Sequence, residues 1–308
     1  MTLDKSYFDY PHRSYGMDHD RYDWSMLSDR KQVQWPEGKK LALWVNVPLQ
    51  FFPLNQKGEP FKVPGGMTMP YPDLRHFSLR QYGNRIGIYR FLKAFDQYGV
   101  KPTFAMNTRL AETNPYLLNS IVERGDEISC HGYHMDAIHW NGLGKDAENE
   151  LIKKSVDSLR NLTGQDIKGW LSPAKNESDD TPDLLAANGI EYFSDWVNDD
   201  MPYQFRTSNG ELTAMPLSTE TEDYFVINGK QHSEDSWVEQ VCDAADFLRK
   251  EADTQGGRIL ALNIHPWLLG QPHRIAKLEK ALEYITAIDG IWSASAGDIR
   301  KSWIQQQA

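Results

Sequence analysis

The sequence is poor in cysteine and has no long hydrophobic run, and both absences limit what the protein can be. Only Cys130 and Cys242 occur among 308 residues. Two cysteines are too few for a disulfide framework and are typical of a reducing compartment. No apolar run reaches eighteen residues, so we expect no membrane span. The N-terminal segment also has no apolar stretch of the kind found in secretory signal peptides. We therefore expect a cytoplasmic protein.

The sequence also has fewer basic than acidic residues. The chain has 33 Lys and Arg residues against 43 Asp and Glu, which gives a formal net charge of −10. Nucleic acids and anionic membranes both require a basic face, so we expect neither as a partner. The remaining composition is ordinary, with 40% hydrophobic and 25% charged residues. That composition excludes a disordered or fibrous chain and predicts a large core.

The first 36 residues are rich in aromatic side chains but show no periodicity. Because so many aromatic rings are not left in water, we expect residues 1–36 to form an irregular but ordered arm on the protein body. No shift in composition and no flexible linker divides residues 37–308. We expect them to form one domain.

From residue 40 onward, short apolar segments alternate with helical patterns. Strands are predicted at 41–47, 102–107, 127–131, 167–171, 191–195, 213–217, 258–265 and 290–294. Helices are predicted at about 84–98, 115–125, 146–162, 182–189 and 233–252, after Pro272, and at the C-terminus. This alternation indicates βαβ units and a parallel sheet. The fold class is therefore α/β, and seven or eight units match one β/α barrel better than an open sheet with a second domain.

A long segment rich in proline and glycine, residues 48–77, follows the first predicted strand. Loops of this length within a compact domain are commonly functional. We expect this segment to shape a pocket.

Polar residues follow several of the predicted strands. In a β/α barrel the working residues lie at the carboxyl ends of the strands, which the barrel brings together. The residues at those ends are Asn46, Gln50, Asn107, His131, Asp195 and His265. We expect His131 and His265 to face one cavity, although each taken alone would fit a hydrogen-bonded core histidine equally well.

Other side chains near these ends allow two interpretations each. Asp195 and Asp199 lie in one loop and are candidates for a base, a histidine partner or a substrate ligand, or else for a turn cap. Arg85 would meet an anionic substrate or form a structural ion pair. Trp170 would line the pocket or pack in the core. His134 is a second nitrogen ligand for zinc beside His131 or, together with His139, a surface loop residue.

Six segments, in this order, resemble the polysaccharide deacetylase superfamily (the NodB-homology domain), and within it the branch similar to the metal-independent allantoinases of the urate pathway. They are KLALWVNV (40–47), SLRQYGNRIG (78–87), EISCHGY (127–133), GWLSP (169–173), DWVNDDMPY (195–203) and NIHPWLLGQPHR (263–274). The resemblance implies a deformed (β/α) barrel of seven or eight units and hydrolysis of a linear or cyclic amide C–N bond.

The resemblance also implies a metal site that this sequence does not complete. Metal-dependent members have two Asp residues at the end of the first strand, two His residues four apart at the third, and a catalytic His at the seventh. His265 and His131 match two of these positions. The first strand offers only Asn46 and Gln50, and Met135 stands four residues after His131. We therefore expect no cofactor, with zinc as the alternative. Because a neutral amide at Gln50 cannot act as a base, the catalytic base stays open.

The leading hypothesis is a hydrolase of a small cyclic or N-acyl amide. His265 would be the acid and base, His131 its partner or the group that orients water, and Asp195 or Asp199 the base or the carboxylate that orients a histidine. The substrate would be bound by Asn46, Gln50, Arg85, Asn107 and Trp170.

Two alternatives stay open. One is a zinc-dependent deacetylase of N-acetyl sugars or polysaccharides, with zinc on His131, His134 and an Asp. The other is a catalytically degenerate barrel that binds a small ligand. Relatives commonly form dimers or tetramers, which implies a homo-oligomer.

Overall fold

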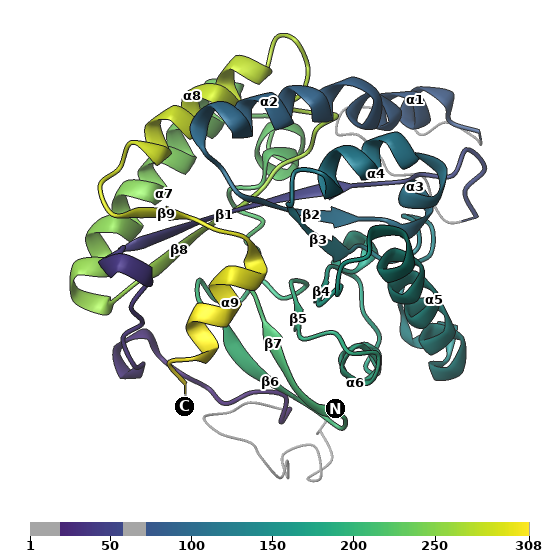
Figure 1. Cartoon of the computed structure of the whole chain (residues 1–308), viewed down its shortest axis with the longest axis horizontal. Coiled ribbons are helices and arrows are strands. Elements are labelled where there is room, and N and C mark those ends of the chain that lie inside the picture. The colour runs from purple at the N-terminus through teal and green to yellow at the C-terminus, as the bar shows by residue number, and fades with distance from the viewer. Residues whose placement is uncertain (1–18, 58–71, 308) are drawn as a thin grey trace, which may run out of the picture.

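Nine strands form one curled sheet in the computed structural model, which describes residues 19–57 and 72–307 (Figure 1). The strands are β1 (Leu41–Leu49), β2 (Pro102–Met106), β3 (Glu127–Cys130), β4 (Gly169–Trp170), β5 (Tyr192–Phe193), β6 (Tyr203–Thr207), β7 (Gly210–Ala214), β8 (Arg258–Asn263) and β9 (Ile291–Ser293). Their order is β6-β7-β5-β4-β3-β2-β1-β8, and β9 pairs with the first residues of β1. All pairs are parallel except β6 with β7. The expected α/β barrel class is confirmed, as a curled half-barrel.

Helices surround the curl. They are α1 (Leu74–Tyr82), α2 (Ile88–Tyr98), α3 (Thr108–Thr113), α4 (Pro115–Val122), α5 (Lys145–Thr163), α6 (Thr181–Ala187), α7 (Glu234–Gln255), α8 (Ile275–Thr286) and α9 (Ala296–Ile304). In Figure 1, α9 lies between β1 and the β6–β7 hairpin. It packs on β1, and its Arg300 donates a hydrogen bond to Thr213 of β7 (3.1 Å). In the described part of the chain, no helix is long and apolar enough to cross a membrane.

Strand β1 is buried on both faces, which explains its unbroken apolar sequence. Its side chains alternate. Leu41 and Leu43 belong to the core shared with the helices, whereas Ala42 and Trp44 belong to the core inside the curl. The same alternation turns Asn46 inward, where its amide donates to the Asn263 side chain of β8 (2.8 Å). The interior therefore changes from apolar to polar toward the carboxyl ends of the strands.

The structure extends and shifts the predicted elements. Helices α1 and α3 and strand β6 were not predicted, and β7 ends at Ala214, three residues before the end of the strand predicted at 213–217. The β6–β7 hairpin turns at Ser208 and Asn209, between the paired residues Thr207 and Gly210. Residues 19–36 are irregular, and Trp35 is buried with its indole donating to the carbonyl of Arg258 (2.8 Å). Residues 1–18 and most of the predicted pocket loop, 58–71, lie outside the described residues.

The loop after β8 packs directly on the backbone of the helical segment that joins α1 to α2. A Cβ atom at Gly87 would lie 2.0 Å from the carbonyl oxygen of Pro266 and close to Gly270. Another at Gly83 would lie 2.6 Å from the amide nitrogen of Trp267. These contacts fix the position of the segment that begins at His265.

Gly87→Ala should therefore destabilise the fold. The added methyl group meets backbone atoms that cannot move aside, so we expect the free energy of unfolding to fall by about 3 kcal/mol. Denaturant titration measures the change. Gly229→Ala is the matched control, because the nearest atom to its Cβ would be at 3.5 Å; it should change stability by less than about 1 kcal/mol. Equal effects of the two substitutions would contradict the packing argument.

Candidate active site

A cavity of about 260 Å³ lies at the carboxyl ends of the strands. His131, which follows β3, and His265, which follows β8, both line it. The structure therefore brings together the two histidines that the sequence analysis placed at one end of a barrel. Other polar residues of the lining are Gln50, Arg80, Ser172, Lys175, Thr219, Glu222, Tyr224 and Asn263.

His265 is held by a buried carboxylate. Asp223 is fully buried, and its two oxygens accept hydrogen bonds from the backbone amide (2.8 Å) and the Nδ1 of His265 (2.7 Å). Because an ionised carboxylate only accepts hydrogen bonds, Nδ1 carries the proton. Nε2 is left as the reactive nitrogen. This arrangement fixes both the tautomer and the orientation of the ring, as a carboxylate does for the histidine of a catalytic triad.

A second carboxylate lies on the other side of the same ring. Oε1 of Glu222 is 3.8 Å from Nε2 of His265. This distance is too long for a direct hydrogen bond, but one water molecule could bind both atoms. Glu222 and Asp223 are adjacent in sequence and precede the π-helical turn Tyr224–Gly229. Two consecutive residues thus place one carboxylate at Nδ1 of the imidazole and another near its Nε2.

His131 is neutral at physiological pH. Its Nδ1 donates to the carbonyl of Leu171 (2.7 Å), and its Nε2 faces the side-chain amide of Gln50 (3.4 Å). The pKa of His131 is lowered to about 4, chiefly by burial; the Leu171 carbonyl opposes this shift and the positive charge of Lys175 adds to it. His131 is therefore a hydrogen-bond acceptor and a weak base.

Two predicted substrate ligands have structural roles instead. Asn46 is buried against Asn263, and Asn263 rather than Asn46 lines the cavity. Asn107 is fully buried; it accepts from the backbone amide of Phe51 (2.8 Å) and donates to the carbonyl of His131. Their side-chain amides join the ends of neighbouring strands, which corrects the prediction that they bind the substrate.

Asp195 stands behind the cavity wall. One oxygen accepts from the backbone amide of Ser172 and the other from its hydroxyl, both at 2.7 Å. Neither oxygen faces the cavity, so Asp195 orients Ser172, and the predicted role as catalytic base is corrected. Burial raises the pKa of Asp195.

Glu177 lies beside Asp195 and accepts a hydrogen bond from the indole of Trp196 (3.0 Å). Burial and the neighbouring charge of Asp195 raise the pKa of Glu177 well above its usual range. Burial beside a second carboxyl group therefore favours the neutral form of Glu177.

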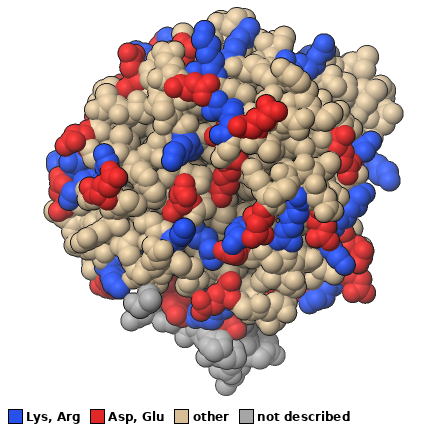
Figure 2. Space-filling view, in the orientation of Figure 1, with Lys and Arg blue, Asp and Glu red and all other residues tan. Residues whose placement is uncertain are grey.

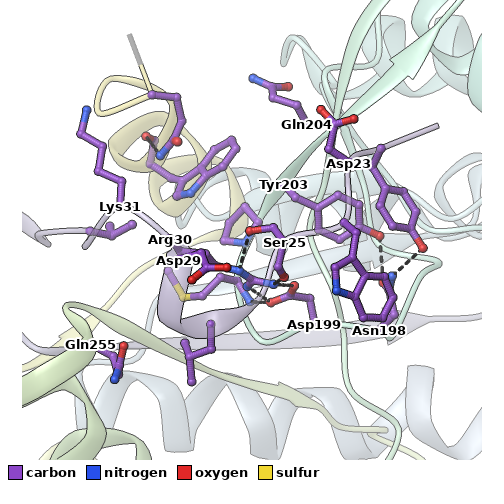
Figure 3. Close-up of a pocket in the computed structure, with 18 of the residues that line it drawn as sticks. Asp23, Ser25, Asp29, Arg30, Lys31, Asn198, Asp199, Tyr203, Gln204 and Gln255 are labelled. Atoms are coloured by element: carbon purple, nitrogen blue, oxygen red, sulfur yellow. Dashed lines mark hydrogen bonds and ion pairs between the residues drawn. The ribbon is translucent and has the colours of Figure 1, made fainter. Parts of the chain in front are cut away.

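Asp199 lies elsewhere, in a separate cavity of about 460 Å³ beneath the N-terminal segment (Figure 3). Arg30 forms a two-pronged ion pair with it, at 2.7 and 2.6 Å. The predicted catalytic role is corrected, because this carboxylate is neutralised by Arg30 and does not line the cavity of the histidines.

The remaining predicted ligands also lie outside the histidine cavity. Arg85 is exposed on the π-helical turn Gly83–Gly87 and is not part of the lining. Trp170 is fully buried, and its indole donates to Ser172 (2.8 Å), so it is a core residue. Gln50 alone among the five predicted substrate ligands lines the cavity.

The two loop histidines do not join His131. His134 is half-buried and accepts from the backbone amide of Asp136 (3.2 Å), outside the cavity lining. His139, predicted to be on the surface, is fully buried with its Nδ1 3.1 Å from Glu148. The zinc site suggested for His131 and His134 does not assemble in this arrangement.

The donor set does not fit the metal site of the metal-dependent relatives. Within residues 19–57 and 72–307, no three His, Cys, Asp or Glu side chains are grouped so as to hold a metal ion. The positions that would carry ligands hold Asn46, bonded to Asn263, and Met135, buried in the cavity wall. Amide and thioether groups are poor zinc ligands compared with imidazole and carboxylate.

Sequence reasoning missed Glu222, Asp223, Arg80 and Lys175. The two carboxylates follow the strand predicted at 213–217, and the rule of strand ends, if applied to that strand, points to the acidic segment TETED (219–223). Arg80 comes from α1, and Lys175 from a tight turn after β4, so neither position carries a local signal.

Comparison with known proteins shows which family this chain resembles. Residues 85–193 match the polysaccharide deacetylase family. The similarity to proteins named as polysaccharide deacetylases extends over most of the chain. The chain is 28% identical over 269 residues to a Schizosaccharomyces pombe protein named as a polysaccharide deacetylase, covering 80% of this chain and 82% of that one. It is 22% identical over 263 residues to a peptidoglycan deacetylase of Helicobacter pylori, covering 73% and 86%.

The crystal structure of PuuE allantoinase is similar over 90% of this chain and 95% of that one, with a TM-score of 0.81 at 24% identity. This likeness confirms the predicted fold. The family match and the curated relatives confirm the predicted enzyme class, a polysaccharide deacetylase-like hydrolase that acts on non-peptide carbon–nitrogen bonds.

The buried pair of Glu177 and Asp195 predicts a specific pH dependence of stability. The folded protein keeps the Glu177 proton at pH values where the unfolded chain has lost it. Stability should therefore fall as the pH rises above about 4.3, the usual pKa of a glutamic acid. Glu177→Gln keeps a neutral hydrogen-bonding group and removes this loss.

The measurement is the free energy of unfolding of both proteins from pH 4 to pH 8. We expect the Gln variant to gain stability relative to the native chain as the pH rises. Glu211→Gln, at an exposed position on β7, is the control and should follow the native curve. Parallel curves for Glu177→Gln and the native chain would contradict the assignment of a retained proton.

Proposed function

We propose that this polysaccharide deacetylase-family chain is a metal-independent hydrolase of a small cyclic or N-acyl amide. The observation that carries the proposal is the geometry at His265. Its Nδ1 is bonded to Asp223, and its Nε2 faces the cavity 3.8 Å from Glu222. Glu222 supplies the carboxylate that the first strand lacks.

In this mechanism His265 accepts one proton from the attacking water while Glu222 holds the water through its other hydrogen. The water oxygen bonds to the amide carbon, and the carbonyl oxygen becomes negatively charged. When the C–N bond breaks, His265 returns the proton to the leaving nitrogen. Asp223 keeps the ring oriented and stabilises the imidazolium between the two steps. The products are a carboxylic acid and an amine, or a single ring-opened molecule.

The size of the cavity favours a small substrate. Pockets for drug-sized ligands are roughly 300–1,000 Å³, and the cavity beside His265 is about 260 Å³. Phe52, Leu171 and Phe225 contribute apolar side chains to the lining, beside the polar side chains already named. A short amide, imide or ureide is the compound class that we propose.

N-acetyl sugars are the second candidate class, because the Helicobacter pylori relative is named a peptidoglycan deacetylase. An N-acetyl group is itself an N-acyl amide, so the same side chains would attack it. A product assay on N-acetylglucosamine and its oligomers, beside cyclic imides and ureides, separates the two classes. Turnover of none of these compounds by the native chain would instead favour a ligand-binding barrel. Cytoplasmic location and homo-oligomer formation stay predictions.

His265→Gln should reduce kcat at least a hundredfold on any substrate that the native chain turns over. This loss is the typical contribution of a general acid–base group. Glu222→Gln should reduce kcat about tenfold, since an amide at this position still holds water but carries no charge. Steady-state kinetics provides the measurement.

Two nearby substitutions serve as controls for these variants. His273→Gln changes an exposed histidine of the same loop, and Glu220→Gln changes an exposed carboxylate two residues before Glu222. Both should retain native kcat. Native activity in His265→Gln would remove the proposed mechanism.

Metal removal should leave activity unchanged, because the proposed steps use only side chains of this chain. The test is the rate after exhaustive dialysis against a chelator, together with the metal content by elemental analysis. We expect less than one metal ion per ten chains and full activity. Loss of activity that added zinc restores would instead support the metal-dependent deacetylase hypothesis.

A further inference from the structure

Lys175 reaches the cavity from a turn with unusual backbone geometry. The turn Pro173–Lys175 follows β4, and both Ala174 (φ 58°) and Lys175 (φ 52°) lie in the left-handed region. Residues with a Cβ atom rarely adopt this conformation, and such strain is concentrated at functional sites. Packing holds the turn in place, because Pro173 is buried against Gly132, where a Cβ atom would lie 2.7 Å from the proline ring.

The ammonium group of Lys175 has spare hydrogen-bonding capacity. Nζ donates one hydrogen bond, to the carbonyl of Leu217 (2.7 Å). An ammonium group has three donors. Within residues 19–57 and 72–307, this ammonium group forms no ion pair, and the carboxylates of Glu222 and Asp195 act on it without direct contact. Burial lowers the pKa of Lys175, while the more distant charges of Glu222 and Asp195 raise it.

A second cation lines the same cavity. The guanidinium of Arg80 stacks on the ring of Trp267, 3.8 Å from its centre, and also lies near Phe52 and Tyr224. Burial lowers the pKa of Arg80 only to about 10, so the group keeps its charge at neutral pH.

Among the described residues that line the cavity, Arg80 and Lys175 are cationic and Glu222 is acidic. Of the carboxylates near the cavity, Glu222 lines it, whereas Asp223 lies behind His265 with both oxygens bonded to that residue. A half-buried ammonium group without a paired carboxylate is stabilised by an anion that arrives with the ligand.

We propose that Lys175 binds a carboxylate of the substrate, so that the substrate class is a small anionic amide, such as an N-acyl amino acid or a cyclic amide that bears a carboxylate. This inference rests on the proposed function for the reaction itself. Beyond the reaction, it specifies that the substrate is negatively charged and that Lys175 selects for that charge. Arg80 contributes to the positive potential of the cavity from behind its aromatic neighbours.

The test is a pair of small probes that differ in one charge. Succinamate carries an amide and a carboxylate, and succinamide carries two amides and no charge. Isothermal titration calorimetry at pH 7 measures the Kd of each probe for the native chain. We expect succinamate to bind about ten times more tightly, because charge-assisted hydrogen bonds are stronger than neutral ones.

Lys175→Met keeps the length of the side chain and removes its charge. We expect it to abolish the preference for succinamate and leave the Kd of succinamide within a factor of about two. Lys175→Arg should retain part of the preference. Lys145→Met, at an exposed position, is the control and should retain all of it. Thermal unfolding checks that each variant is folded.

Three results would overturn the proposal. They are equal binding of the two probes by the native chain, an unchanged preference in folded Lys175→Met, and no detectable binding of either probe at 10 mM. Because calorimetry of these probes requires no turnover, failure here is distinguishable from failure of the proposed hydrolase, which the kinetics of His265→Gln tests separately.

Discussion

The bond between Asp223 and His265 is the interaction on which the candidate site depends. It takes up both oxygens of a fully buried carboxylate and leaves a single reactive nitrogen in the cavity. A buried charge without such partners would be strongly destabilising. The pair is therefore part of the buried core and part of the candidate site. It also joins the segment before the π-helical turn to the residues that follow β8.

The strand ends show how the site differs from that of metal-dependent relatives. Asn46 of β1 bonds to Asn263 of β8, and Asn107 binds the backbone on either side of it. These amides stabilise the junctions between strands without carrying charge. The carboxylates beside His265 are instead Glu222 and Asp223, which lie outside the strands. Acidic and basic side chains on the face shown in Figure 2 are interspersed, so the local charges of the cavity matter more than a broad surface field.

Most of the sheet was predictable because its strands are buried on both faces and therefore form continuous apolar runs. The meeting of His131 and His265 was predictable for the same reason, since parallel strands end at one edge. Asp199 and Trp170 could not be placed in this way. Their roles depend on Arg30, 169 residues away, and on packing against Ser172. Lys175 was equally hidden, because a left-handed turn of Ala174 and Lys175 has no signature in residue type.

The adjacency of Glu222 and Asp223 has a consequence for how the enzyme tolerates heat. Both residues directly precede one short π-helical turn, Tyr224–Gly229, whose backbone bonding differs from that of the longer helices around it. Local opening of that turn would withdraw the two acids together and release the imidazole from its anchor. On heating, the activity would then be lost through cooperative unfolding of a few residues, before the sheet itself unfolds.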